Sequence, residues 1–238
     1  MKTMAFVTIA VWACGIQPAV AQDETAPPEG VFDISGSASV TSDYMFRGIS
    51  LSGNDPAVQA SLEAQHRSGF YVGVWGSSIA KYAGTNVETD LYAGWRGEAA
   101  GVELDLGAQA YLYPGGKGGN YVELIGSAGK TLGPVQAEAG VAYAPAQNNI
   151  GSQDNLYVFG TLSSGIPGTP LTLTLDGGYE DGSLAGPKGR KWDWGVTLDY
   201  VRGPFSVSVS YKDSDVARLL DPGKLARGRV IGTVTVTF

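Results

Sequence analysis

The residues of this sequence with the clearest chemical potential are carboxylates spaced through segments in which polar and apolar residues alternate. Because side chains on an extended chain alternate between two faces, the carboxylates of each segment share one face. We find no lysine or arginine at the matching positions inside these segments, so the sequence predicts an acidic wall that attracts cations and repels anions. The predicted lining residues are Glu63, Glu88, Asp90, Glu103, Asp105, Glu123, Glu138, Asp176, Asp193 and Asp199.

Two pairs of these carboxylates, Glu88 with Asp90 and Glu103 with Asp105, could bind Ca²⁺ through oxygen ligands. No loop ligands at defined spacing accompany them, so a hydrated acidic wall is the simpler interpretation. The sequence also lacks a glycine-rich phosphate loop, a set of Cys and His ligands, and a basic patch. We therefore predict no metal site, no cofactor and no nucleic-acid partner.

Catalysis finds little support in the residue types. Proteolytic or lipolytic chemistry needs a base, usually a histidine, within reach of a nucleophile or a water molecule. His66 is the single histidine, and it ends an alternating segment beside Ser68-Gly69. A side chain at a membrane interface explains this position better than a catalyst does, so we predict that the protein is not an enzyme.

The elements that must position the carboxylates are β-strands. Twelve segments alternate with period two, and short turns alternate with longer polar loops between them. This arrangement is typical of transmembrane barrels, whereas a soluble all-β protein would have no reason for it. We predict strands at residues 32–41, 58–65, 70–77, 87–95, 102–112, 122–128, 135–143, 156–162, 171–176, 192–200, 205–211 and 229–238.

The last segment shows why the strands should close on themselves. It places Val230, Val234 and Phe238 on one face and threonines on the other, and it stops on Phe238 with nothing after it to cover a strand edge. A barrel removes that edge because the last strand pairs with the first. The fold class predicted is an all-β, antiparallel up-and-down transmembrane barrel of about twelve strands.

Composition and the N-terminal segment agree with this fold. Glycine accounts for 35 of 238 residues and charged residues for 16%, below the roughly 25% of a soluble domain. Residues 1–21 have a basic start, an apolar run and the small-residue site Ala19-Val20-Ala21, which predicts a cleaved signal peptide. Residues 22–30 form a flexible lead-in and residues 31–238 the barrel. An outer aromatic girdle is expected from Tyr113, Tyr143, Tyr179 and Tyr211.

The segment Thr41 to Ser50, which reads Thr-Ser-Asp-Tyr-Met-Phe-Arg-Gly-Ile-Ser, resembles the hallmark of the TorF-type porin family, also catalogued as Gcw_chp. Pro56-Ala57-Val58-Gln59 extends the likeness. Members of that family often carry a second basic residue where this chain has Met45. The resemblance implies an outer-membrane barrel of Gram-negative bacteria of a kind proposed to be porins.

Two residues of this segment, Asp43 and Arg47, lie four apart at the predicted rim of the first loop. A salt-bridged anchor of the loop is the favoured interpretation, and a constriction or solute contact is the other. We predict passive transport of small cationic or neutral polar solutes. The alternative is a non-conducting structural or interaction barrel plugged by its loops. Expected partners are outer-membrane lipid and, through Phe238, the barrel assembly machinery.

Overall fold

The computed structural model describes residues 31–217 and 220–238. The predicted signal peptide and lead-in lie outside these residues. Within the described part of the chain, no helix is both long enough and apolar enough to cross a membrane.

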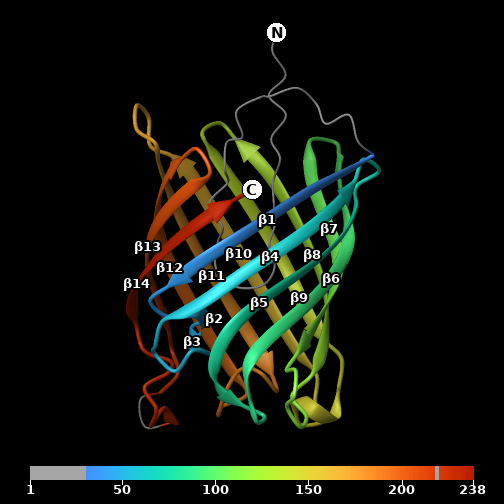
Figure 1. The fold of residues 1–238 in the computed structure, drawn as a ribbon, viewed down its shortest axis with the longest axis vertical. Coiled ribbons are helices and arrows are strands. Elements are labelled where there is room, and N and C mark those ends of the chain that lie inside the picture. Colours follow the sequence, from blue (N-terminus) through green and yellow to red (C-terminus); the bar gives the residue numbers. More distant parts are fainter. Residues whose placement is uncertain (1–30, 218–219) are drawn as a thin grey trace.

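Twelve antiparallel strands form one closed barrel, as predicted (Figure 1). Neighbours in the sequence are neighbours in the sheet, except that a small separate sheet of β2 (Met45–Phe46) and β3 (Ile49–Ser50) interrupts the first connection. A short 3₁₀ helix, Asn148–Ile150, lies in one of the connections. The barrel strands are β1 (Phe32–Thr41), β4 (Ala57–His66), β5 (Phe70–Tyr82), β6 (Thr85–Ala99), β7 (Val102–Leu112), β8 (Tyr121–Leu132), β9 (Val135–Ala144), β10 (Asn155–Gly165), β11 (Leu171–Gly182), β12 (Arg190–Arg202), β13 (Phe205–Ser214) and β14 (Arg229–Thr237).

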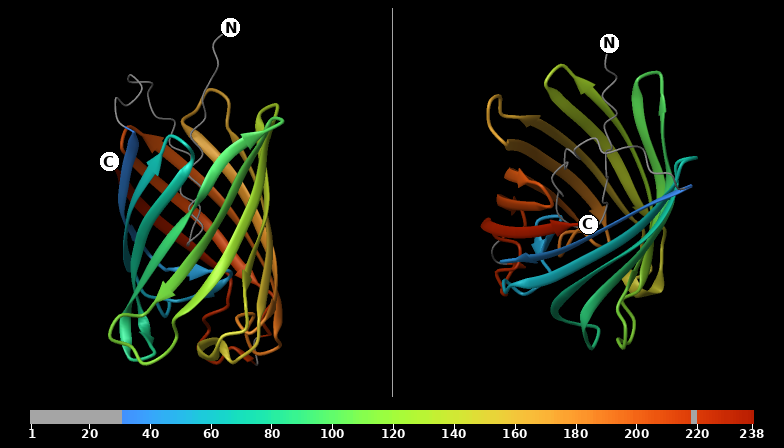
Figure 2. Two further views of the ribbon diagram at one scale, coloured as in Figure 1. Left: turned by 90° about the vertical axis from the view of Figure 1, so that its right-hand side faces the viewer. Right: turned by 45° about the horizontal axis from the view of Figure 1, so that its top comes forward.

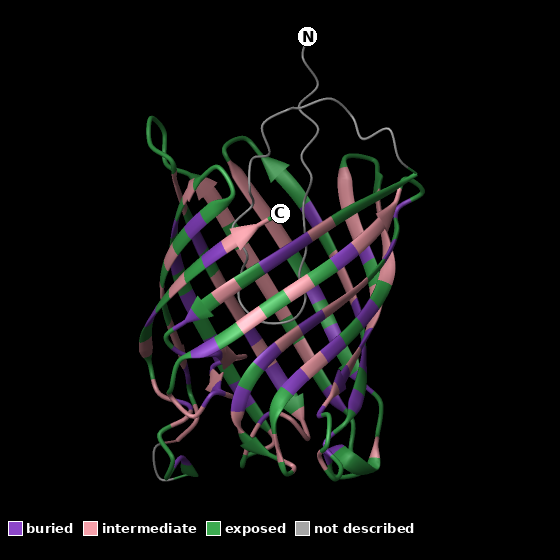
Figure 3. Cartoon of the chain, viewed as in Figure 1, coloured by how far each residue is buried: buried purple, intermediate pink, exposed green. Residues whose placement is uncertain are grey.

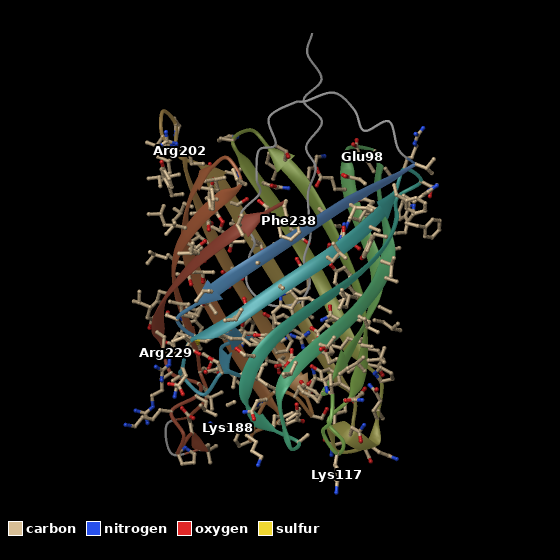
Figure 4. The ribbon with its side chains drawn as sticks, viewed as in Figure 1. Glu98, Lys117, Lys188, Arg202, Arg229 and Phe238 are labelled. Atoms are coloured by element: carbon tan, nitrogen blue, oxygen red, sulfur yellow. The ribbon has the colours of Figure 1, made fainter. Side chains whose placement is uncertain are left out.

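The two ends of the barrel differ. One end, here called the turn end, carries the short connections together with the start of β1 and the end of β14, and lies at the top of Figure 1. The opposite end, the loop end, carries the longer connections. Figure 4 shows Glu98 and Arg202 at the turn end and Lys117 and Lys188 at the loop end.

One connection at the loop end differs from the prediction. A long loop was expected around residues 80–86, but β5 and β6 continue to Tyr82 and Thr85, which pair with each other. Ala83 and Gly84 alone form the turn, with φ of 51° and 99°. Two successive positive φ values match the right-handed twist of the flanking strands, which favours a tight hairpin. The expected regular alternation of long and short connections is therefore wrong at this point.

Barrel closure joins β1 to β14. The amide of Gly36 donates to the carbonyl of Phe238 at 2.8 Å, and the amide of Phe238 donates to the carbonyl of Gly36 at 2.9 Å. The phenyl ring lies over Gly36, where a Cβ atom would stand 2.7 Å from Phe238 Cε2. The terminal aromatic thus extends the last ladder and covers a glycine of the first strand.

Buried and exposed positions alternate along the strands (Figure 3). The exposed positions are mainly apolar, whereas the buried positions are mainly polar or aromatic. On β12 the exposed positions include Trp192 and Trp194, whereas Lys191, Asp193 and Asp199 are buried. In a closed barrel the buried face is the interior, so the usual arrangement of a soluble protein is inverted. Aromatic side chains on the interior wall lie flat because glycines face them. The ring of Tyr92 covers Gly73 on the adjacent strand, and a Cβ atom there would overlap the ring.

The predicted aromatic girdle is only partly formed. Tyr143 and Tyr211 are exposed, and Tyr179 is half-buried. Tyr113 is only 8% exposed and belongs to an interior cluster with Tyr111, Tyr121 and Trp75, so its assignment to the girdle is wrong. It is in phase with Asp105, Gln109 and Tyr111, which face the interior, so continuing the alternation of β7 by one residue would have placed it inside.

Candidate functional site

All ten carboxylates predicted to line the lumen lie on inward strand faces. They come from seven strands: Glu63 from β4, Glu88 and Asp90 from β6, Glu103 and Asp105 from β7, Glu123 from β8, Glu138 from β9, Asp176 from β11, and Asp193 and Asp199 from β12. Glu180 on β11 belongs to the same set and was missed. It is in phase with Asp176, so continuing the alternation beyond residue 176 would have found it.

The expectation that no lysine or arginine lies among these carboxylates is wrong. Arg96 on β6 contacts Glu63 at 2.5 Å and Asp105 at 2.9 Å. Its guanidinium also lies 3.8 Å from the ring centre of Tyr71, whose hydroxyl donates to Asp105 at 2.6 Å. A carboxylate on each side and an aromatic face hold this cation on the barrel wall.

Two lysines form further interior pairs. Lys191 on β12 pairs with Glu180. Lys212 on β13 contacts Asp176 on β11 at 2.5 Å, and it crosses β12 at Gly195, where there is no side chain to obstruct it. Lys191, Lys212 and Arg96 lie just outside the predicted segments, because β6, β12 and β13 are longer than the sequence pattern indicated.

The first connection folds into the barrel and places Arg47 inside it. Arg47 and Gly48 form the turn between β2 and β3, with φ of 47° and 75°. The guanidinium donates to both oxygens of Glu123, at 2.9 and 2.6 Å, and to Glu180 at 2.7 Å. Glu123 lies on β8 and Glu180 on β11, with β9 and β10 between them. One side chain therefore joins two separated parts of the barrel wall.

Aromatic and electrostatic contacts hold Arg47 in its charged form. Its guanidinium carbon lies 4.5 Å from the ring centre of Phe46 and 4.3 Å from that of Tyr157. Burial by itself would lower the pKa of Arg47, but Glu123 and Glu180 outweigh that effect and raise the pKa well above its ordinary value. The side chain is a permanent cation in this position.

Asp43 and Arg47 do not pair with each other, although the spacing favoured such an anchor. Asp43 accepts hydrogen bonds from Ser50 Oγ at 2.6 Å and Ser52 Oγ at 2.8 Å. Its other oxygen lies 3.4 Å from Arg229 Nε at the start of β14. Asp43 thus anchors the loop to the rim, while Arg47 reaches the opposite wall.

Other residues of the first connection contact two sides of the barrel interior. The ring of Tyr44 meets Trp75 edge to face at 5.4 Å, and its hydroxyl donates to Glu88 at 2.9 Å. On the other side, Ser214 Oγ donates to the carbonyl of Gly48 at 3.1 Å. Figure 2 shows the β2 and β3 hairpin within the ring of strands toward the loop end. We refer to residues 43–52 as the inner loop.

Glu88 and Asp90 differ from the other interior carboxylates. Both are fully buried, and neither forms an ion pair within the described residues. Gln109 on β7 donates from Nε2 to Asp90 Oδ2 at 2.8 Å. Glu88 Oε2, Asp90 Oδ1 and Gln109 Oε1 are buried acceptors without a hydrogen-bond donor. No group of three or more His, Cys, Asp or Glu side chains in the described chain has the arrangement of a metal site.

The remaining wall of the interior is rich in hydroxyls. Ser37 and Ser61 lie 2.7 Å apart through their Oγ atoms on β1 and β4, and Thr233 Oγ1 donates to Thr41 Oγ1 at 2.9 Å. On β13, Ser208 Oγ donates to Asp199 at 2.5 Å. This wall can exchange hydrogen bonds with water or with polar solutes.

His66 lies at the turn end, as the sequence predicted. It is the last residue of β4 and belongs to the set of alternate positions that face outward. Its ring meets Phe32 edge to face at 5.1 Å, and its Nδ1 atom lies 2.6 Å from Ser68 Oγ. These neighbours suit a side chain at a membrane interface.

Comparisons with known proteins agree with this architecture. A family model described as "Bacterial protein of unknown function (Gcw_chp)" matches residues 25–238. The KdgM porin structure covers 86% of this chain and 97% of its own, with a TM-score of 0.55 and 10% identity. The NanC porin structure covers 87% of this chain and 99% of its own, with a TM-score of 0.56 and 9% identity. At such low identity the likeness shows the fold alone. No curated protein matches the sequence.

Proposed function

The chain belongs to the Gcw_chp family, and from its barrel and charged interior we propose that it is an outer-membrane channel through which small polar solutes diffuse passively. The observation that carries this proposal is the inverted distribution of side chains. Trp192 is 56% exposed on the outer face of β12, while its neighbours Lys191 and Asp193 are buried inside. An apolar exterior suits lipid, and a charged, hydroxyl-bearing interior suits water and dissolved solutes.

The charge balance of the interior favours cations and neutral polar solutes. Carboxylates outnumber the cations Arg47, Arg96, Lys191 and Lys212 on the inward faces, even though each of these cations has an acidic partner. An excess of negative charge between low-dielectric walls concentrates cations and excludes anions. The predicted lining residues supply that excess.

The inner loop acts as the constriction in this proposal. Arg47 ties it to β8 and β11, and Tyr44 packs it against β5 and β6. Solutes that enter at the loop end must pass the charges that surround Arg47. If the loop never moves, the same contacts make a plug, and the protein is a structural or interaction barrel. The Arg47 bridge is the specific observation that favours this second candidate.

The membrane partners belong to the same proposal. The exposed apolar faces contact outer-membrane lipid, and residues 1–21 direct export as a cleaved signal peptide. Phe238, which is 74% exposed beside Gly36, presents the last strand to the barrel assembly machinery. Outer-membrane barrels place their short turns in the periplasm and their longer loops outside the cell. By that rule the turn end faces the periplasm and the loop end faces the cell exterior.

The deciding experiment is single-channel recording of the refolded mature protein in a planar bilayer under a salt gradient. The proposal expects steady conductance steps and a reversal potential that shows cation preference. Anion preference would defeat the charge argument. A correctly folded barrel that gives no steps would favour the plugged barrel instead.

A further inference from the structure

We propose that Glu88, Asp90 and Gln109 bind a hard metal cation, of which Ca²⁺ is the model, on the inner wall formed by β6 and β7. This inference goes beyond the proposed channel, because a folded barrel can hold such a cation whether or not it conducts.

Uncompensated charge is the first argument. Asp90 is 0% exposed and Glu88 1% exposed, and neither contacts a cation among the described residues. Elsewhere in the same interior, Glu63, Asp105 and Glu123 all have arginine partners. Burial of an ionised carboxylate without a compensating charge is strongly unfavourable. A positively charged species at Glu88 and Asp90 would remove that cost.

The hydrogen bonds of the cluster leave acceptors only. The hydroxyl of Tyr44 donates to Glu88 Oε1 at 2.9 Å, and Gln109 Nε2 donates to Asp90 Oδ2 at 2.8 Å. Tyr113 is a further hydrogen-bond partner of Glu88. These bonds orient the two carboxylates, and no donor lies within hydrogen-bond distance of Glu88 Oε2 or Asp90 Oδ1. In known metal sites, hydrogen bonds from neighbouring residues orient the ligands in the same manner.

Gln109 is an independent indication of a cation, because it carries no charge and lies on the adjacent strand. It is 1% exposed, and its amide oxygen has no hydrogen-bond donor. Buried amide oxygens are normally satisfied. The amide nitrogen donates to Asp90 Oδ2, which places the whole amide group beside that carboxylate.

The ligand set determines the class of cation. Two carboxylates and one amide supply oxygen atoms only, which hard cations prefer over the nitrogen and sulfur ligands of softer metals. Ca²⁺ takes six to eight oxygen ligands, so water would complete the coordination. With so few protein ligands the cation would exchange readily. A proton shared between Glu88 and Asp90 is the competing explanation, and the experiment separates the two.

The test is Tb³⁺ luminescence of the folded, full-length mature barrel in detergent, because Tb³⁺ replaces Ca²⁺ and is excited through nearby aromatic rings. Trp75 and Tyr111 flank Asp90 in the strand register. We expect saturable emission that Ca²⁺ displaces. Glu88→Gln and Asp90→Asn should each weaken Tb³⁺ binding at least about tenfold, the usual range for loss of a ligand or its support.

Glu98→Gln is the matched control, because Glu98 lies on the same strand, exposed at the turn end (Figure 4). It should leave Tb³⁺ binding unchanged. Gln109→Glu, which adds a third carboxylate of the same size, should strengthen binding. Circular dichroism checks that each variant retains the barrel.

Three results would overturn the proposal. The first is an absence of saturable emission from the folded protein. The second is emission that survives in both Glu88→Gln and Asp90→Asn. The third is an infrared band of a protonated carboxyl group that persists at saturating Ca²⁺ and disappears in Asp90→Asn, which would establish the shared proton. None of these measurements depends on conductance, so failure here and failure of the channel are distinguishable.

Discussion

Arg47 donates to both carboxylate oxygens of Glu123, at 2.9 and 2.6 Å, from a turn that lies inside the barrel. Such a bidentate pair fixes orientation as well as distance. Glu180 accepts a third hydrogen bond from the same guanidinium. The inner loop is therefore held at its tip by the barrel wall, and its release would require these bonds to break together.

Arg47→Ala should open the constriction. We expect a larger single-channel conductance than that of the unchanged protein, because the tip of the inner loop loses its attachment to β8 and β11. Removal of one partner from a buried ion pair should also destabilise the fold by about 3–5 kcal/mol. Bilayer recording and thermal unfolding measure the two effects. Lys81→Ala removes an exposed cation at the loop end and is the control. Equal conductance in Arg47→Ala and Lys81→Ala would contradict the constriction.

Gly48→Ala should displace the inner loop without changing any charge. A Cβ atom at Gly48 would lie 2.7 Å from Ser214 Cβ and 2.9 Å from Asp193 Cβ, and the backbone has a φ of 75°. Gly84→Ala is the matched control, because Gly84 has a φ of 99° but no atom within 4 Å of its Cβ position. Backbone strain alone costs about 1–3 kcal/mol, so both variants should unfold at lower temperature. Only Gly48→Ala should change conductance. A change of equal size in Gly84→Ala would show that packing at Gly48 is not the cause.

Asp199→Asn should weaken cation preference. Asp199 is fully buried on the inward face of β12 and accepts a hydrogen bond from Ser208 rather than from a cation. Lys212 acts on Asp199 electrostatically, but its ion pair is with Asp176. Neutralising Asp199 therefore removes interior negative charge that is not held in an ion pair, so the reversal potential under a salt gradient should move toward zero. Asp181→Asn is the control, because Asp181 is exposed on the outward face of β11. A reversal potential unaffected by Asp199→Asn would remove this residue from the permeation path.

Gly36→Val should weaken barrel closure. Its Cβ atom would stand 2.7 Å from Phe238 Cε2, so the terminal ring must leave the surface of β1. Overpacking of this kind costs about 1–3 kcal/mol. Gly232→Val on β14 is the control, because nothing lies within 4 Å of its Cβ position. Loss of folded barrel, read from heat-dependent electrophoretic mobility, should be greater for Gly36→Val. Equal loss in both variants would show that the ring contact does not matter.

The sequence alone determined the features that depend on strand periodicity. Alternation with period two predicted the number of strands, the closed barrel and the inward face of every predicted carboxylate. It also placed His66 on the outward phase at the turn end. These features depend on residues one or two positions apart, so they can be read directly from the order of residues in the sequence.

The tertiary structure decided which charges meet. Arg47 is 76 residues from Glu123 and 133 residues from Glu180, and no local pattern relates positions so far apart. The positions of the strand ends also decided which cations lie inside. Arg96, Lys191 and Lys212 lie on inward faces because their strands extend beyond the clear alternation. Pairing depends on barrel closure, on strand register and on a loop that folds inward. Each of these brings together side chains through space rather than along the chain.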